Sequence, residues 1–306
     1  MYDIVILGGG PAAVSAGIYA ARKKMSSAII ADNLAGQSIV SDDINNWIGI
    51  KSISGFALAK SMEDHLRAYD GIDIFDGELV TKVERIEGGF VALTPSEKRF
   101  EAKTVLVATG GSHRKLGIPG EEKFEGKGVV FCSTCDAPLF KGKDVAVIGG
   151  GNAGLEAVLD LVPYASKIYL LVRSEKIRGD LATLDKVKAS EKVEILYNTV
   201  ANEVLGDVMV SGLKVTDSIS GIEREMPVSG VFVEIGTVPN SDMVKGLVEL
   251  DEKGEIKIDC RTGRSSLVGI WAAGDVSDAL YKQNNLAAGD GIKATLNAYD
   301  YIRNGI

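Results

Sequence analysis

Two segments of the chain repeat the same order of apolar, glycine-rich and helical positions. In both, a short apolar run (2–7 and 144–148) leads into three glycines (8–10 and 149–151), and small or apolar residues then follow at helical spacing (11–21 and 155–162). Each segment predicts a strand, a tight turn and a helix. We therefore infer an internal duplication of the strand–turn–helix unit that binds nucleotides.

The rest of the chain alternates short apolar runs with Gly, Asp and Pro, which predicts further strands. A helical pattern over 286–302 closes the chain, and stretches containing Gly, Pro or Ser at 110–120 and 236–242 mark two crossings between domains. We predict an α/β fold of two Rossmann-like, three-layer ββα dinucleotide-binding domains, the second inserted in the first. The first comprises 1–114 and 241–306, and the second comprises 115–240. The predicted strands are 72–75, 80–86, 90–94, 104–109, 167–173, 193–197, 208–216, 231–235 and 269–273.

Composition agrees with a folded two-domain chain. The 306 residues are 45% hydrophobic and 25% charged, and 34 Lys and Arg against 42 Asp and Glu give a net charge of −8, which disfavours nucleic acid as a partner. No apolar run approaches the ~18 residues of a membrane helix, and the start of the chain lacks the basic stretch of a signal peptide. We expect no membrane partner and a cytoplasmic location. Gly is frequent (36) while Pro is rare (7), which indicates close approach of the backbone to other groups.

The first glycine turn matches the dinucleotide fingerprint G-x-G-x-x-G/A through Gly8, Gly10 and Ala13. In this fingerprint the first glycine allows the tight turn, the second lets the backbone approach a pyrophosphate, and the amides at the helix start bind the anion. Asp32 follows the next apolar run, where a carboxylate can hold a ribose hydroxyl. The alternative is a glycine turn and a solvated acid with structural roles only.

The second glycine turn carries all three glycines of the fingerprint, at Gly149, Gly151 and Gly154. Two dinucleotides in one chain indicate a flavin and a nicotinamide, because a hydride passes between two stacked rings. After the next predicted strand there is no acid of the kind that NAD sites carry, whereas Arg173 and Arg178 could pair with a 2′-phosphate. This pattern favours NADPH, and the alternative is a solvated basic loop.

Cys132 and Cys135 form a C-x-x-C pair that precedes the second fingerprint. This spacing allows a small disulfide ring, and a position at a helix start would lower the pKa of a thiol. Zinc is the main alternative, but the remaining candidate ligands, Cys260, His65 and His113, have no paired spacing. We predict a redox pair and no metal.

These motifs resemble low-molecular-weight thioredoxin reductase over nearly the whole chain. Many local details also resemble the flavoprotein subunit of alkyl hydroperoxide reductase without its additional N-terminal thioredoxin-like domains. The segments that carry the resemblance are ILGGGPAA (6–13), AGQ (35–37), NNWIG (45–49), LVATG (106–110), LGIPGE (116–121), CSTCDAP (132–138), IGGGNAG (148–154), EIGTVPN (234–240), AAGDV (272–276) and YKQNNLAAGDG (281–291).

The resemblance implies a role for each matching position. Cys135 would face the flavin ring, Cys132 would attack the disulfide of a thioredoxin-like protein, and Asp136 would protonate the leaving thiolate. A homodimer is implied as well. Asp32 remains the ribose candidate, and the further positions implied to bind FAD are Gly8, Gly10, Pro11, Ala12, Gly36, Gln37, Asn46, Val80, Thr109, Gly110, Gly274, Asp275, Gln283 and Asn284. The pyridine-nucleotide candidates are Gly151, Asn152, Ala153, Arg173, Arg178 and Gly236.

The chain departs from the family pattern where the nucleotide is selected. Typical NADPH-dependent members carry His-Arg-Arg after the strand of the second domain, whereas this chain has Val172 and Ser174 on either side of Arg173. Peroxide-linked relatives have Glu at the position of Val172 and prefer NADH. We predict a reductase that moves electrons from NADPH through FAD and the cysteine pair to a thioredoxin-like protein. The alternatives are an NADH- or ferredoxin-dependent disulfide reductase that feeds a peroxide-reducing system, a flavin dithiol oxidase, and a non-catalytic nucleotide binder.

Overall fold

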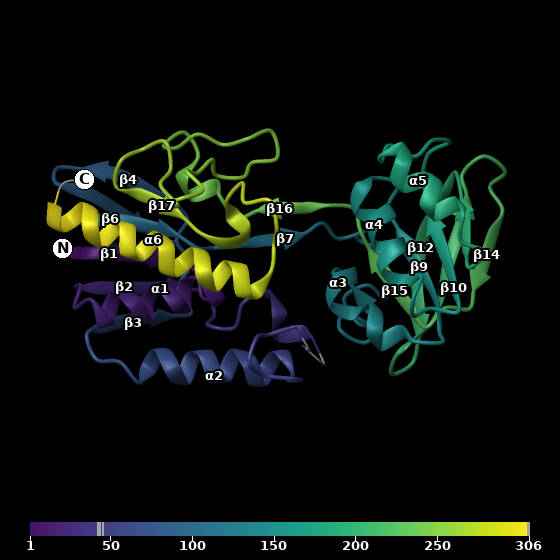
Figure 1. Cartoon of the computed structure of the whole chain (residues 1–306). Coiled ribbons are helices and arrows are strands. Elements are labelled where there is room, and N and C mark those ends of the chain that lie inside the picture. The colour runs from purple at the N-terminus through teal and green to yellow at the C-terminus, as the bar shows by residue number, and fades with distance from the viewer. Residues whose placement is uncertain (42–43, 45, 305–306) are drawn as a thin grey trace. The chain divides into compact units, whose positions relative to one another are not determined.

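The computed structural model describes residues 1–41, 44 and 46–304 (Figure 1). The chain divides into two compact units. Unit 1 comprises residues 1–112 and 238–306, and unit 2 comprises residues 113–237, which are inserted in the sequence of unit 1. Among the described residues, no helix has both the length and the apolar content that crossing a membrane requires.

Unit 1 is built on a seven-stranded sheet that is parallel in one part and antiparallel in the other. Its longest strand, β6 (Arg99–Val107), joins the two parts: residues 99–102 pair antiparallel with β5, whereas residues 105–107 pair parallel with β17. The parallel part has the order β3-β2-β1-β6-β17. The remaining strands are β1 (Tyr2–Leu7), β2 (Ser27–Ala31), β3 (Ile72–Asp76), β4 (Lys82–Ile86), β5 (Gly89–Leu93) and β17 (Ile270–Ala272).

Both faces of the unit 1 sheet are covered, and the central strand shows why. Along β1, Ile4 and Ile6 pack into one hydrophobic cluster and Val5 and Leu7 into another, as the two-residue period of a strand requires. The first cluster includes the apolar sides of helices α1 (Pro11–Arg22) and α6 (Asn284–Asn304), which lie side by side (Figure 1). Helix α2 (Gly55–Arg67) contributes Leu66 to the same cluster.

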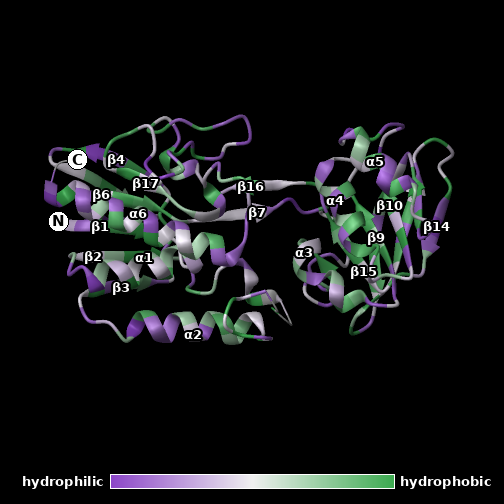
Figure 2. Cartoon of the chain, viewed as in Figure 1, coloured by the Kyte–Doolittle hydropathy of each residue, from purple (hydrophilic) through white to green (hydrophobic). Residues whose placement is uncertain are grey.

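Unit 2 repeats this architecture with a five-stranded parallel sheet of order β11-β10-β9-β15-β8 and a three-stranded antiparallel sheet of order β12-β13-β14. Along β9 (Asp144–Ile148), Val145 and Val147 pack with helix α4 (Asn152–Leu161), whereas Ala146 and Ile148 pack with the antiparallel strands. The central strands of both units are hydrophobic along most of their length (Figure 2). The other elements are β8 (Val129–Val130), β10 (Lys167–Leu171), α5 (Leu181–Lys188), β11 (Val193–Leu196), β12 (Thr199–Gly206), β13 (Val210–Asp217), β14 (Glu223–Met226) and β15 (Gly230–Val233).

Two short strands carry the chain between the units. Strand β7 (Gly111–His113) follows β6, strand β16 (Thr237–Pro239) follows β15, and the two pair with each other. The remaining short elements are η1 (Gln37–Val40), α3 (Ser133–Asp136), η2 (Ala137–Phe140), η3 (Asp242–Val244) and η4 (Gly274–Val276). The repeated combination of a parallel sheet, an antiparallel three-stranded layer and helices confirms the predicted α/β fold with two Rossmann-like units.

Candidate active site

The first glycine turn lies between β1 and α1, and its glycines are needed for two different reasons. Gly8 has φ +119°, and a Cβ there would lie 2.3 Å from the Ala108 carbonyl oxygen. A Cβ on Gly9 would lie 1.9 Å from the Asn33 carbonyl oxygen. Both glycines are therefore required by the contact of the turn with neighbouring backbone.

Gly10 is different because the protein leaves room beside it. Its φ of −81° suits any residue, and the nearest atom to a Cβ there is the Gly36 Cα at 3.8 Å. Gly10 is the N-cap of α1, no side chain caps that helix, and Pro11 occupies its first turn. The helix start therefore has uncapped amides beside open space, which is the arrangement that binds a phosphate. This cradle fits the pyrophosphate of FAD.

The second glycine turn also contains glycines that contact neighbouring backbone and one glycine with open space beside it. Gly149 has φ +149° with its Cβ position 2.2 Å from the Glu234 carbonyl oxygen, and a Cβ on Gly154 would lie 2.0 Å from the Gly149 carbonyl oxygen. Gly151, in contrast, is the uncapped N-cap of α4 and has no atom within 4 Å of its Cβ position. The second turn therefore offers an equivalent anion cradle, which fits a pyridine nucleotide.

The loop after β10 folds back on the second turn. The Arg178 amide donates to the Gly150 carbonyl at 2.7 Å, and the Asn152 side-chain oxygen accepts from the Asp180 amide at 2.7 Å. Arg173 and Arg178 are both exposed, whereas Val172 is buried and packs over Gly150. Both predicted phosphate-binding arginines therefore lie on the loop that borders the second cradle.

In unit 1, the ends of β6 and β16 are joined next to the first turn. Thr109 donates through its hydroxyl to the Asn240 carbonyl and accepts at its own carbonyl from the Asn240 side chain (3.0 Å). The Asn240 amide also donates to the Gly110 carbonyl at 3.0 Å. The Gln37 side-chain nitrogen lies 3.5 Å from the Cβ position of Gly110. Asn240 therefore fixes the segment that the resemblance implies closes over the flavin.

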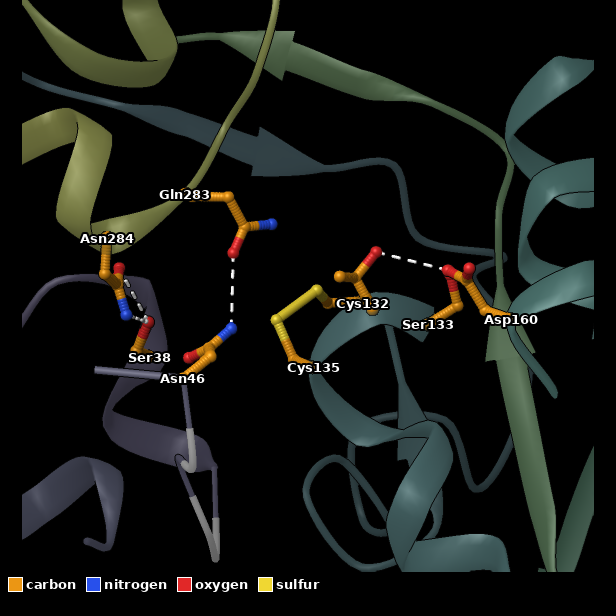
Figure 3. The surroundings of a disulfide bond; sticks show 9 residues. Ser38, Asn46, Cys132, Ser133, Cys135, Asp160, Gln283 and Asn284 are labelled. Carbon is orange, nitrogen blue, oxygen red and sulfur yellow. Dashed lines mark hydrogen bonds between the residues drawn. A yellow bond between two sulfur atoms is a disulfide. The ribbon is translucent and has the colours of Figure 1, made fainter. Parts of the chain in front are cut away.

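The start of α6 is held to the 37–48 segment by amide side chains (Figure 3). Asn284 and Ser38 exchange hydrogen bonds of 2.8 and 3.1 Å, and the Asn46 amide donates to the Gln283 side-chain oxygen at 3.3 Å. Asn285 adds a bond to the Asn46 carbonyl at 2.7 Å. Three of the residues implied by the resemblance, Asn46, Gln283 and Asn284, are thus brought together from distant parts of the sequence.

Asp275 lies in η4 next to this helix start. Burial raises the pKa of its carboxyl group, nearby Asp290 and Glu255 add to that shift, and Lys282 opposes it. Lys282 also forms an ion pair with Glu255 at 3.1 Å and donates to the carbonyls of Asp275 and Ser277. A lysine that sequence reasoning missed therefore holds the η4 loop.

The cysteine pair is in unit 2, where Cys132 and Cys135 form the predicted disulfide at the single turn of α3 (Figure 3). Cys132 is the N-cap, and its carbonyl accepts from the Asp136 amide at 3.1 Å. Asp136 is buried beside the pair. Because the two sulfurs are bonded to each other, they are not zinc ligands in this form. Within the described residues, no group of three or more His, Cys, Asp and Glu side chains is placed to hold a metal.

A further acid contacts the two residues between the cysteines, and another follows the adjacent strand. Asp160 of α4 accepts from the hydroxyls of Ser133 and Thr134 at 2.8 and 3.2 Å (Figure 3). Glu234 directly follows β15 in the same unit. Burial raises the pKa of Glu234 to about 8, and the negative charges of Asp160, Asp136 and Glu156 add to this shift.

The other predicted site residues lie at the edges of these cradles. Asp32 is exposed directly after β2, and Val80 is buried just before β4. Gly36 has φ +68° and faces Gly10, with its Cβ position 3.0 Å from the Gly10 Cα. Gly236 (φ +100°) accepts from the Arg114 amide. Gly274 (φ +72°) lies between Ala12 and Ala287, and Ala153 is exposed in the first turn of α4.

Two dinucleotide cradles in one chain, together with a disulfide in the unit that carries the second cradle, define a flavin-dependent disulfide oxidoreductase. The chain belongs to the pyridine nucleotide-disulphide oxidoreductase family, whose model matches residues 2–300. This membership confirms the class that the sequence predicts and implies FAD and a nicotinamide cofactor.

Solved structures of thioredoxin reductases are similar over the whole chain. The Streptococcus pyogenes MGAS5005 enzyme is 35% identical with a TM-score of 0.93, covering 99% of this chain and 98% of that one. The Giardia duodenalis enzyme is 31% identical with a TM-score of 0.91, covering 99% of each. The F subunit of alkyl hydroperoxide reductase from Staphylococcus aureus strain MSSA476 is 41% identical over 301 residues. That match covers 98% of this chain, which spans only 59% of the length of that relative.

Sequence reasoning missed Asp160, Glu234, Asn240 and Lys282 as site residues. A weak signal existed for two of them. Glu234 is an acid inside a run otherwise predicted as an apolar strand, and Asp160 is an acid within an apolar helical pattern. A polar group in an apolar run has to find a partner, and Asp160 finds the hydroxyls of Ser133 and Thr134 in the turn between the cysteines.

Proposed function

We propose that this chain is a disulfide reductase that takes electrons from NADPH and passes them through FAD and the Cys132–Cys135 pair to a thioredoxin-like protein. The observation that carries the proposal is the disulfide at α3, in the same unit as the second nucleotide cradle. A nucleotide-binding scaffold without redox chemistry has no use for an intact pair. Similarity to thioredoxin reductases over 99% of the chain supports the same function.

When bound, the flavin would supply two electrons to the cysteine pair. Reduction breaks the Sγ–Sγ bond and takes up two protons, so that two thiols result. Cys132 then attacks one sulfur of the partner's disulfide and forms a mixed disulfide with it. Cys135 next attacks the Cys132 sulfur, which releases the partner and closes the pair again. Asp136, buried beside the pair, is proposed to protonate the departing thiolate of the partner. The partner leaves as a dithiol, which balances the electrons and protons.

The choice of donor rests on the loop that borders the second cradle. Arg173 and Arg178 are exposed there, where they could bind a 2′-phosphate, and this supports NADPH. Val172 stands where typical NADPH-dependent members of the resembled family have His. The second candidate function is an NADH-dependent reductase that feeds a peroxide-reducing protein, and the 41% identity to the F subunit of alkyl hydroperoxide reductase favours it.

Anaerobic stopped-flow mixing with NADPH, NADH and reduced ferredoxin separates these functions. Bleaching of the flavin absorbance by NADPH, followed by reduction of a thioredoxin, is the expected result. Faster bleaching by NADH would favour the peroxide-linked function, and bleaching by ferredoxin alone would refute a pyridine-nucleotide donor. Peroxide formation from a small dithiol without any nucleotide would identify an oxidase instead.

A control variant tests the roles of the cysteines. Cys135→Ser is expected to abolish thioredoxin reduction while FAD stays bound, because the pair cannot form. Retained turnover would overturn the assigned roles.

We also propose a homodimer, which sedimentation of the FAD-loaded protein measures directly.

A further inference from the structure

The loop of residues 173–180, which follows β10, is attached to the second glycine turn by two hydrogen bonds. The Arg178 amide donates to the Gly150 carbonyl at 2.7 Å. The Asp180 amide donates to the side-chain oxygen of Asn152 at 2.7 Å. The first bond joins two backbone groups, whereas the second depends on the Asn152 side chain. The second attachment is therefore the one that a substitution can remove.

Gly179 lies between these two attachments and brings the loop close to the cradle. A Cβ at Gly179 would lie 3.1 Å from the Asn152 side-chain oxygen and 3.2 Å from the Gly151 carbonyl carbon. Gly151 is the N-cap of α4, where the amides of the second cradle begin. Ile177 packs against the hydrophobic cluster to which α4 belongs. The loop backbone is thus held against the cradle on both sides of Arg178.

The side chain of Asn152 is suited to this attachment and not to a phosphate. Its Oδ1 is a hydrogen-bond acceptor, and an acceptor cannot bind the anionic oxygens of a phosphate. Asp180, which donates to this oxygen, is the N-cap of α5, and its carboxylate accepts from the Thr183 amide at 2.8 Å. Asn152 therefore joins the first turn of α4 to the start of α5.

We propose that Asn152 is a positioning residue for nucleotide selection. By holding the 173–180 loop, its side chain sets the position of the Arg178 backbone relative to the second cradle, and with it the preference for a nucleotide that carries a 2′-phosphate. The inference rests on the proposed function, in which NADPH is the donor. Arginine binds phosphate through a planar fork whose bonds depend on direction, so a displaced backbone weakens them. Loss of the attachment should therefore weaken binding of the 2′-phosphate selectively.

Hydrogen exchange tests the positioning without any nucleotide. In the full-length, FAD-loaded protein, mass spectrometry follows deuterium uptake by peptides that contain the amides of residues 173–183. Asn152→Ala removes the acceptor of the Asp180 amide and is expected to speed exchange of the loop by about 3- to 10-fold. Asn152→Asp keeps an acceptor oxygen and should retain the parent's protection. Unchanged exchange in Asn152→Ala would overturn the proposal.

Calorimetric titration of the same FAD-loaded protein tests the selection. The probes are 2′,5′-ADP and AMP, which differ by the 2′-phosphate alone. The ratio of their affinities is expected to fall by about 3- to 10-fold in Asn152→Ala. Equal weakening of both probes would mean that the substitution damages the whole cradle, and would overturn the selective role. A parent protein that bound both probes equally would refute NADPH as the donor and the selective role with it, while exchange still decides whether Asn152 positions the loop.

Asn202→Ala is the matched control. Asn202 of β12 donates to the Thr216 hydroxyl of β13, so the same substitution removes an asparagine hydrogen bond from the antiparallel sheet of unit 2. It is expected to leave both the exchange of residues 173–183 and the affinity ratio at the parent's values. Shifts equal to those of Asn152→Ala would mean that general loosening of unit 2 causes them, and would refute the positioning role.

Discussion

The clearest separation of folding from cofactor binding is expected at neighbouring glycines of the first turn. Gly10→Ala places a Cβ 3.8 Å from the nearest protein atom at a φ of −81°, so the apo-protein accommodates it without strain. Removing conformational freedom from the unfolded chain favours the apo-protein by about 0.4–1 kcal/mol, and because Ala is a poorer N-cap than Gly, the net change in its stability should be small. The same methyl group occupies space that the pyrophosphate of FAD needs, and a clash of this kind costs about 1–3 kcal/mol.

That cost corresponds to roughly 5- to 150-fold weaker FAD binding. It is measured by titrating apo-protein with FAD and following flavin fluorescence, while urea unfolding of the apo-protein reports stability. Gly9→Ala is the matched control, because its Cβ would lie 1.9 Å from the Asn33 carbonyl oxygen and should destabilise the fold itself. If Gly10→Ala bound FAD with the parent's affinity, or lost stability as Gly9→Ala does, the assignment of this cradle would be wrong.

Three further predictions concern other parts of the chain. Glu121→Ala should lower the free energy of unfolding by about 1.5–3 kcal/mol, because this buried carboxylate accepts hydrogen bonds of 2.8 and 2.7 Å from two backbone amides. Urea titration measures the change, and an unchanged midpoint would contradict the prediction. Gly291→Ala should lower Tm, since its Cβ would lie 2.1 Å from the Ala12 carbonyl oxygen, whereas Gly289→Ala on the same helix meets no atom within 4 Å and should raise Tm. Glu234→Gln should raise the Tm of the oxidised protein more at pH 8.5 than at pH 5. The pKa of this carboxyl group is about 8 in the folded chain and 4.5 in the unfolded chain. Native stability therefore falls as pH rises between these two values. Equal effects of the substitution at both pH values would refute this reasoning.

The elements with strong apolar runs could be predicted from the sequence. Strand β1 and helix α1 begin where the pattern places them, and so do β9 and β10. Their signal is local, because a buried parallel strand needs consecutive apolar residues and a glycine turn ends it. The same local signal predicts the disulfide, since two residues between cysteines suit a small ring.

Elements whose strand or helix character depends on neighbours could not be predicted. Strand β14 has the sequence EREM, in which only Met226 is buried, and it becomes a strand because β13 pairs with it. Strand β12 has a register shift between Ala201 and Glu203 that breaks its alternation. Helix α5 is short, and its start was recognisable only from Asp180, which caps it by accepting from the Thr183 amide.

The contacts of Asp160 could not be predicted for a different reason, because they depend on which elements meet. Helix α4 begins at the second nucleotide cradle, next to Gly151, and carries Asp160 near its other end. Asp160 is nine positions after Gly151, which at 1.5 Å per residue corresponds to about 13.5 Å along the helix axis. A single rigid helix therefore keeps the second cradle and the turn between the cysteines at a fixed separation within unit 2. A substitution that shortened or kinked α4 should disturb nucleotide binding and the conformation of the turn between the cysteines together.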